Sequence, residues 1–342
     1  MSTRSSSHFT SFPISYTRNK ETINTSRMPV FIRKKDRRLK STIESNNNQD
    51  FELKESEDSS SVNLQYIEFS SDDKSKNTQR SIHEPVIILH GLLGSKRNFS
   101  SLGTSLSKQL KKHRRIFAVD LRNHGENHHD WRDTMTYTEM AEDVLQFMNK
   151  LHLSKAILVG HSMGGKVAKT MALLSPNRVS GLVVLDIAPV RYCPKTDKSW
   201  AAVKNIIDAL SSLSLTPGKT KRDIDLELRE TVEDPALRAF VLTNLDQQRD
   251  MQQLTWKINI ESISNQLDVI AGFDLSTAES VYNGDTFIIH GGASRFVRST
   301  HMQTIAEYFP NHMLTTIRGA GHWVHAEAPD DTLALLKRYL DR

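Results

Sequence analysis

From about residue 62 onward, short apolar runs alternate with longer segments whose apolar residues recur at helical spacing. A continuous apolar run of strand length is typical of a parallel strand that is buried on both faces. Alternation of such strands with helices predicts an α/β fold, with a mostly parallel central sheet and helices on both faces. We expect strands at 62–69, 86–89, 116–119, 153–160, 181–185, 287–289 and 313–317, and helices at 99–110, 137–151, 166–174, 300–308 and 324–340.

This alternation is interrupted once. Between about residues 200 and 273 the pattern is helical and mixed, and it contains no convincing strand. The simplest interpretation is an insertion between two strands of the sheet. We expect it to form a helical cap, at about 195–273, over the carboxyl ends of the strands.

The beginning of the chain has a different composition. Residues 1–40 are rich in serine, threonine and arginine, and their first acidic residue is Glu21. That composition predicts a mitochondrial transit peptide, with an ordinary disordered basic tail as the alternative. Residues 41–61 are rich in asparagine, serine and glutamate and have too little apolar surface to fold, so they are expected to form a disordered linker. The folded domain is then 62–342.

Charge and composition exclude several classes of protein. The formal net charge of the chain is +5. Residues 1–40 contain ten basic and two acidic residues, whereas residues 81–342 have a net charge of about +2. Because the basic charge belongs to the leader, we do not expect nucleic-acid binding. The single cysteine, Cys193, rules out an internal disulfide. No run of 18 apolar residues exists, so no transmembrane segment is expected.

The strongest chemical signal is the Gly-His-Ser-Met-Gly sequence at 160–164. An apolar run ends at Gly160, and a segment with helical spacing follows. A strand that passes directly into a helix forces a sharp, strained turn at Ser162, and glycines on either side let strand and helix approach closely. Such a turn exposes the serine hydroxyl. The pattern resembles the nucleophile elbow of the α/β-hydrolases, and this resemblance predicts Ser162 as the nucleophile.

A serine hydroxyl needs a base to take its proton, and in this fold the base follows the last strand. Residues 319–323, Gly-Ala-Gly-His-Trp, come after the predicted strand 313–317 and before the final helix. Of the fourteen histidines, His322 alone has this context. We therefore predict His322 as the base.

The base needs an acidic partner that orients it. In many α/β-hydrolases this acid follows the strand that resumes after the cap, but 290–297 contain no carboxylate. Asp186 closes the preceding strand, 181–185, whose end lies at the same edge of the sheet. We therefore favour Asp186 as the acid; the alternative is an aspartate that only braces a loop.

The oxyanion of an acyl-transfer reaction needs backbone N–H donors. One is expected from Met163, the residue after the nucleophile. The other is expected from Leu92, in the loop after the strand 86–89.

Other histidines suggest no metal site. His124, His128 and His129 with Asp130 lie in a polar segment without a recognised ligand spacing, so a solvated surface is the better interpretation. His325, three residues after His322, is interpreted as a histidine on a helix face.

Four motifs in this order resemble one branch of the α/β-hydrolases. They are H-G-L-L-G-S at 90–95, D-L-R-N-H-G at 120–125, G-H-S-M-G-G-K at 160–166 and L-D-I-A-P at 185–189. The branch contains small bacterial esterases, mitochondrial proteins related to the eleventh abhydrolase, and the yeast ethanol acetyltransferases. The resemblance covers roughly 62–342, and in that branch the acid follows the strand after the elbow helix, in agreement with Asp186.

The resemblance implies two-step acyl transfer through an acyl-serine, on small-molecule esters, thioesters or alcohols and without a cofactor. An alcohol acetyltransferase that uses acetyl-CoA as acyl donor, with esterase and thioesterase activity, is the expected function. A plain mitochondrial carboxylesterase or thioesterase is the alternative, and a non-catalytic interaction protein is the third possibility. The resemblance also implies import by the mitochondrial import and processing machinery, and location in the matrix.

Overall fold

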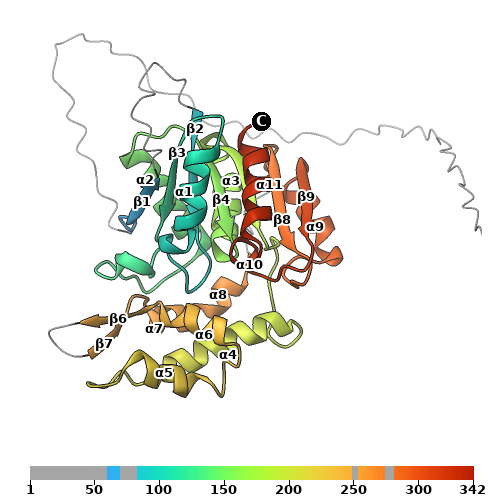
Figure 1. The fold of residues 1–342 in the computed structure, drawn as a ribbon. Coiled ribbons are helices and arrows are strands. Elements are labelled where there is room, and N and C mark those ends of the chain that lie inside the picture. Colours follow the sequence, from blue (N-terminus) through green and yellow to red (C-terminus); the bar gives the residue numbers. More distant parts are fainter. Residues whose placement is uncertain (1–59, 70–82, 249–252, 274–280) are drawn as a thin grey trace, which may run out of the picture. The chain divides into compact units, whose positions relative to one another are not determined.

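The computed structural model describes residues 60–69, 83–248, 253–273 and 281–342. A seven-stranded sheet lies at the centre of this part of the chain. Its strand order is β1-β3-β2-β4-β5-β8-β9 (Figure 1), and only the pair β1 and β3 is antiparallel. The predicted, mostly parallel sheet is thus confirmed. The predicted leader and all but the last two residues of the predicted linker lie outside the described residues. The strands are β1 (Tyr66–Phe69), β2 (His83–Leu89), β3 (Arg114–Val119), β4 (Ala156–His161), β5 (Val179–Leu185), β8 (Thr286–Gly291) and β9 (His312–Ile317).

Helices cover both faces of the sheet, because successive residues of each strand point to opposite sides. Along β2, Val86 and Ile88 pack into one apolar cluster with α1 and α11, whereas Ile87 and Leu89 pack into another with α2, α3 and α9. Each fully buried aliphatic side chain contributes about 1.5–3 kcal/mol. The helices are α1 (Ser100–Gln109), α2 (Tyr137–Lys150), α3 (Met163–Leu174), α9 (Met302–Tyr308), α10 (Val324–Glu327) and α11 (Pro329–Leu340), with short 3-10 turns η2 (Lys96–Phe99), η3 (Gly125–Asn127), η4 (Pro176–Arg178) and η5 (Ser299–His301).

The final helix is broken, contrary to the single helix predicted over 324–340. It consists of α10 and α11, separated at Ala328, whose backbone has φ −136° and ψ 63°. The cause is Pro329, because a proline ring disfavours helical backbone angles in the residue before it. Proline then suits the first position of α11.

The insertion predicted at about 195–273 follows β5 and packs at one end of the sheet (Figure 1). The expectation that it contains no strand is wrong, because β6 and β7 form an antiparallel pair within it. Each has only four residues and few apolar positions, so the alternation that marks a strand is too short to recognise. The elements are α4 (Lys198–Ser212), α5 (Lys221–Leu228), α6 (Pro235–Leu242), β6 (Leu245–Gln248), β7 (Gln253–Trp256), α7 (Ile260–Asn265) and α8 (Leu267–Ala271).

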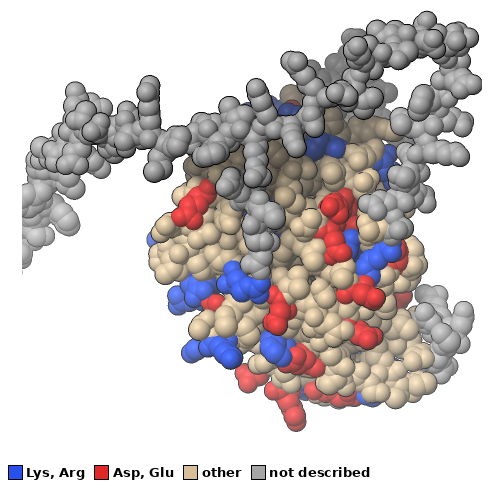
Figure 2. Space-filling view, turned by 180° about the vertical axis from the view of Figure 1, so that it is seen from behind, with Lys and Arg blue, Asp and Glu red and all other residues tan. Residues whose placement is uncertain are grey.

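Charged side chains of both signs are mixed on the surface. On the face that Figure 2 shows, basic and acidic residues are interspersed among uncharged ones in the described part of the chain. None of the helices in the described ranges combines the length and apolar character that crossing a membrane requires.

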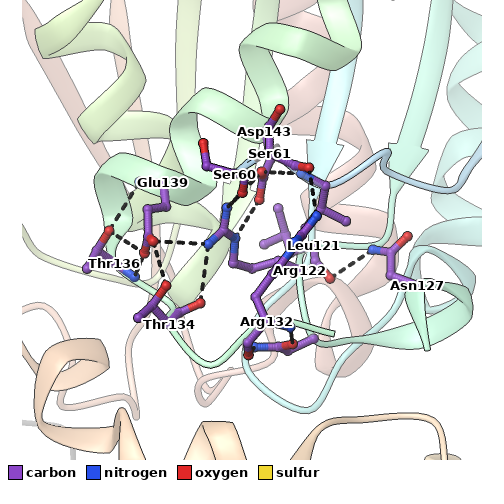
Figure 3. A network of polar contacts seen from close by, with 12 residues as sticks. Ser60, Ser61, Leu121, Arg122, Asn127, Arg132, Thr134, Thr136, Glu139 and Asp143 are labelled. Atoms are coloured by element: carbon purple, nitrogen blue, oxygen red, sulfur yellow. Dashed lines mark hydrogen bonds and ion pairs between the residues drawn. The ribbon is translucent and has the colours of Figure 1, made fainter. Parts of the chain in front are cut away.

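A buried ion pair holds the segment after β3 against α2 (Figure 3). Arg122 binds both oxygens of Asp143 through Nε and Nη2, at 2.7 and 2.9 Å, and neither side chain is more than 2% exposed. The backbone N–H of Val62 donates to the same carboxylate at 2.8 Å, and Arg122 also donates to the carbonyl of Ser60. This one pair therefore fixes the beginning of the described domain, the D-L-R-N-H-G segment and α2 together.

We predict that Arg122→Met lowers the free energy of unfolding by about 3–5 kcal/mol, because it leaves the Asp143 carboxylate buried without its partner. Removing both charges in Arg122→Met/Asp143→Leu should restore at least half of that loss. Lys204→Met breaks an exposed pair with Asp208 and should cost less than about 1 kcal/mol. Urea unfolding of the four proteins measures these values. A single Arg122→Met variant as stable as Lys204→Met would contradict the prediction.

Candidate active site

The turn between β4 and α3 consists of Ser162 alone. Its φ of 51° and ψ of −117° lie outside the regions that a residue with a side chain prefers, at a cost of about 1–3 kcal/mol. Hydrogen bonds hold the turn on both sides. The N–H of Ser162 donates to the carbonyl of Leu185 at 3.0 Å, and the N–H of Lys166 donates to the carbonyl of Ser162 at 3.1 Å.

Two glycines make this turn possible. A Cβ on Gly160 would lie 2.3 Å from the carbonyl oxygen of Gly164, and a Cβ on Gly164 would lie 2.4 Å from that of Leu89. Neither distance can accommodate a side chain, so β4, α3 and β2 approach as closely as backbone allows. The predicted elbow is present, with α3 beginning directly after the serine.

The structure brings the three residues predicted for the triad into one chain of hydrogen bonds. The Oγ of Ser162 lies 2.9 Å from Nε2 of His322, and Nδ1 of His322 lies 2.7 Å from Oδ2 of Asp186. With Asp186 ionised, Nδ1 carries the proton, and Nε2 is left as the acceptor that faces the serine hydroxyl. This geometry suits a serine that passes its proton to an oriented imidazole.

Asp186 is completely buried, with 0% exposure, and its φ is 54°. Its Oδ1 accepts the N–H of Gly291 at 3.0 Å, and its Oδ2 accepts the hydroxyl of Ser294 as well as His322. These donors compensate the burial of the carboxylate and fix its orientation. The sequence did not predict the role of Ser294. It lies in the segment after β8 that lacks a carboxylate, and this segment supplies a hydrogen-bond donor to Asp186 instead.

His322 is held by two further rings. Nε2 of His161 donates to the carbonyl oxygen of His322 at 3.0 Å, and the ring of Phe296 lies 4.1 Å from that of His322, centroid to centroid. Burial lowers the pKa of His161 well below its ordinary value, and the nearby His325 and His322 lower it further. His161 is therefore neutral and acts as a support. In the sequence, only the position of His161 directly before Ser162 could have indicated this contact.

The two residues whose backbone N–H groups are predicted for the oxyanion belong to segments next to the serine. Met163 is the first residue of α3, where backbone N–H groups have no partner within the helix. The loop after β2 contacts the elbow so closely that a Cβ on Gly91 would lie 3.1 Å from the Cβ of Ser162. Leu92 and Met163 both line the cavity that contains Ser162.

That cavity has a volume of about 350 Å³ and lies between the strand ends and the insertion. Apolar residues of α4 and α6 form much of its wall, and among the described residues that line it none is an aspartate or glutamate. The apolar contributors include Leu92, Val203, Ile206, Leu237 and Phe240. A cavity of this size and character suits a small or medium-sized apolar group next to the serine.

Lys166 ties the insertion to the elbow helix. Its Nζ donates to the carbonyls of Ala271 and Gly272 at 2.8 and 2.7 Å, at the end of α8, and lies 4.8 Å from the ring centroid of Tyr192. A cation at the carboxyl end of a helix is favourable for the helix dipole. This explains the lysine that ends the G-H-S-M-G-G-K motif.

The histidines that were interpreted as surface residues divide into two groups. His128 and His129 are exposed, but His124 is completely buried, which corrects the expectation for it. Two hydrogen bonds compensate the burial of the His124 ring. Nε2 accepts the N–H of Leu93, and Nδ1 lies within hydrogen-bond distance of the carbonyl of Arg122. His325, which is interpreted as a histidine on a helix face, lies on α10 and stacks on Phe99. Within the described residues no group of three or more potential ligands could hold a metal ion.

Buried His124 predicts a pH-dependent stability. Burial lowers its pKa from 6.5 to about 3, and the neighbouring His90 adds to the effect. Between these values the unfolded chain binds a proton that the folded chain does not, so stability falls as pH falls, by about 1.4 kcal/mol per pH unit. Glutamine does not titrate. The free energy of unfolding of the wild type, relative to that of His124→Gln, should therefore fall by about 1.4 kcal/mol for each pH unit below about pH 6.

Urea unfolding at a series of pH values measures this difference. His128→Gln, which alters an exposed histidine, is the control and should follow the wild type at every pH. A difference between wild type and His124→Gln that stays constant over this range would show that His124 titrates normally in the folded protein.

Comparisons with known proteins agree with this architecture. Residues 84–329 match the family described as alpha/beta hydrolase fold. The chain is 37% identical over 282 residues to the zebrafish (Danio rerio) protein named sn-1-specific diacylglycerol lipase ABHD11, covering 82% of this chain and 83% of that protein. It is 33% identical over 274 residues to a Saccharomyces cerevisiae protein named "probable alcohol acetyltransferase", covering 75% of this chain and 77% of that one.

A solved structure, titled marine microorganism esterase, is similar over its entire length. The TM-score is 0.73 at 32% sequence identity, and the match covers 82% of this chain and 100% of that chain. The elbow, the sheet order and these similarities lead to one conclusion. The chain belongs to the α/β-hydrolase family, in its group of esterases and lipases.

Proposed function

We propose that the protein transfers acyl groups through an acyl-enzyme on Ser162. The observation that carries this proposal is the chain of hydrogen bonds from Ser162 through His322 to Asp186 at the wall of an apolar cavity. Membership of the esterase and lipase group supports a hydrolytic enzyme of this kind.

In the first half of the reaction, Nε2 of His322 takes the proton of Ser162 as its Oγ attacks the carbonyl carbon of an ester or thioester. The amides of Leu92 and Met163 donate to the oxygen that becomes negatively charged. When the tetrahedral intermediate collapses, His322 gives the proton to the leaving alcohol or thiol, and the acyl group stays on Ser162. Asp186 stabilises the protonated imidazole throughout.

In the second half, His322 deprotonates a second nucleophile, which attacks the acyl-serine and releases the product. We propose that this nucleophile is an alcohol and that acetyl-CoA is the donor, so that acetate esters form, with hydrolysis of esters and thioesters when water takes the alcohol's place. The apolar wall of the cavity favours an alcohol over water, and the similarity to the yeast protein supports the same choice. A plain carboxylesterase or thioesterase is the second candidate.

The experiment supplies the full chain with acetyl-CoA, with and without ethanol or isoamyl alcohol, and follows free CoA, acetate and volatile ester. We expect ester to form, and Ser162→Ala to lower the rate by about 10⁴-fold or more. Ser199→Ala is the matched control, because Ser199 also lines the cavity but lies on α4. Its rate should stay near that of the wild type.

Acetate without ester would replace the acetyltransferase proposal with a thioesterase. CoA release that is equal in wild type and Ser162→Ala would contradict acyl transfer by Ser162 altogether. Failure of a fluorophosphonate probe to label Ser162 in folded protein would favour a non-catalytic interaction protein.

We also propose that residues 1–40 direct the protein into the mitochondrial matrix. The support is their composition, ten basic residues against two acidic ones, with frequent serine and threonine. A fluorescent protein fused after residues 1–61 should co-localise with a matrix marker and lose part of the leader on import. Diffuse fluorescence with an uncut leader would contradict the proposal.

A further inference from the structure

Two buried histidines join the loop that follows β2 to the loop that follows β3. His90 and His124 are 1% and 0% exposed, and neither touches Ser162 or His322 through a hydrogen bond. They belong to the H-G-L-L-G-S and D-L-R-N-H-G motifs, the second of which has no part in the mechanism above. We refer to residues 90–94 as the oxyanion loop.

The two side chains make reciprocal hydrogen bonds. Nε2 of His90, from the oxyanion loop, accepts the N–H of Leu121 at 2.9 Å in the loop after β3. Nε2 of His124, from the loop after β3, accepts the N–H of Leu93 at 3.2 Å in the oxyanion loop. The two rings lie 5.1 Å apart, centroid to centroid. Each loop thus supplies one histidine and one backbone donor, and we refer to this arrangement as the histidine clasp.

The protonation of both rings follows from these contacts. Nδ1 of His90 lies 2.8 Å from the carbonyl of Gly91, and Nδ1 of His124 lies 2.9 Å from the carbonyl of Arg122, so each Nδ1 must carry the proton and each Nε2 must be bare. Burial lowers the pKa of both histidines, against a smaller opposing effect of Asp120 on His90. The clasp consists of two neutral rings of one tautomer.

Leu93 shows what the clasp holds in place. Its φ is 61°, in the left-handed region that a leucine avoids, so this conformation persists only where the surroundings impose it. Its N–H is held by His124, and its carbonyl accepts Nδ2 of Asn244, from the insertion, at 2.8 Å. Side chains from two other parts of the fold therefore fix both backbone groups of this strained residue.

The residue before Leu93 is Leu92, whose N–H is assigned above to the oxyanion. Leu92 and Leu93 are the two central residues of one turn, which is closed by a hydrogen bond from the N–H of Gly94 to the carbonyl of Gly91 at 2.9 Å. A change in the backbone angles of Leu93 distorts this turn, and the Leu92 amide, in the peptide group before Leu92, moves with it. A donor contributes to catalysis only when it is already aimed at the position that the oxyanion will occupy. The conformation of Leu93 and the orientation of the Leu92 amide are therefore coupled.

We propose that His124 is a positioning residue for the acyl-transfer reaction, which aims the Leu92 amide at the oxyanion by holding Leu93 in its strained conformation. The inference rests on the proposed function, because it needs Ser162 to form a tetrahedral intermediate. It assigns to the D-L-R-N-H-G motif a role in transition-state stabilisation. It also makes the insertion a contributor to the same loop, through Asn244.

A matched pair of substitutions separates this role from a structural one. The amide of glutamine reaches the place of a histidine Nε2, whereas that of asparagine reaches only the place of Nδ1. His124→Gln therefore keeps the bond to Leu93 and loses that to Arg122, and His124→Asn does the reverse. Each removes one hydrogen bond from the same buried position.

The full-length variants are assayed with p-nitrophenyl acetate and with a trifluoromethyl ketone, which forms an oxyanion on the serine. We expect His124→Asn to lower kcat about 10- to 100-fold with KM changed by less than about 3-fold, since the lost contact is made in the transition state. Affinity for the ketone should fall by a similar factor. His124→Gln should stay within about 3-fold of wild type in both measurements.

Equal kcat values and equal ketone affinities in the two variants would overturn the proposal. If His124→Asn does not fold, Asn244→Leu tests the same loop from the insertion, and we expect the same selective loss of kcat and ketone affinity; wild-type values there would overturn the proposal. Ser162→Ala is run in parallel. Turnover that persists in Ser162→Ala would overturn the proposed acyl-enzyme. If turnover depends on Ser162 but is the same in His124→Asn and His124→Gln, only the proposed role of His124 is overturned.

Discussion

The close approach of α3 to the strands on either side of it is the constraint on which the site depends. A Cβ at Gly160 or Gly164 would lie 2.3 or 2.4 Å from a carbonyl oxygen, so the backbone contact exists only because both residues are glycine. The contact leaves a single residue, Ser162, to reverse the chain between strand and helix. The backbone strain at Ser162 costs about 1–3 kcal/mol, and the packing of the buried sheet around it offsets this cost.

Parallel topology then gathers the other groups. The strands β2, β4, β5, β8 and β9 all end at one edge of the sheet, so the residues that follow them lie close together although they are distant in sequence. Asp186 follows β5, His322 follows β9, and the loop after β8 supplies the hydroxyl of Ser294 that donates to Asp186. The insertion covers this edge, and its apolar helices give the cavity its character.

Several polar groups that are buried around the site have fixed partners in the backbone. Asp186, His161, Lys166 and His124 each bind backbone groups of another segment, at donor–acceptor distances between 2.8 and 3.4 Å. Leaving such a group without a partner in a low-dielectric interior is costly, so each of these contacts restricts the loops to one arrangement. The chemical groups are held before any substrate arrives, which is the condition for electrostatic stabilisation of a transition state.

Much of this arrangement could be predicted from the sequence, because it follows from local patterns. Buried parallel strands appear as apolar runs, the elbow has its own glycine spacing, and His322 and Asp186 each follow a recognisable strand. Ser294, His161 and the role of His124 could not be predicted, because their partners lie in loops that follow other strands and nothing in their own segments marks those contacts. The short pair β6 and β7 and the break at Ala328 were missed for local reasons, limited length in one case and a proline within an apolar helical pattern in the other.

The central claim is that Ser162 carries the acyl group between donor and acceptor. Its most direct test is intact-protein mass spectrometry on enzyme that is quenched with acid during turnover of p-nitrophenyl acetate, followed by peptide mapping. The account predicts a transient gain of one acetyl group, on the peptide that contains Ser162, which disappears when the substrate is exhausted and never forms in Ser162→Ala. Sustained turnover by a protein that stays unmodified at Ser162, or an acetyl group on another residue that turns over at the steady-state rate, would contradict it.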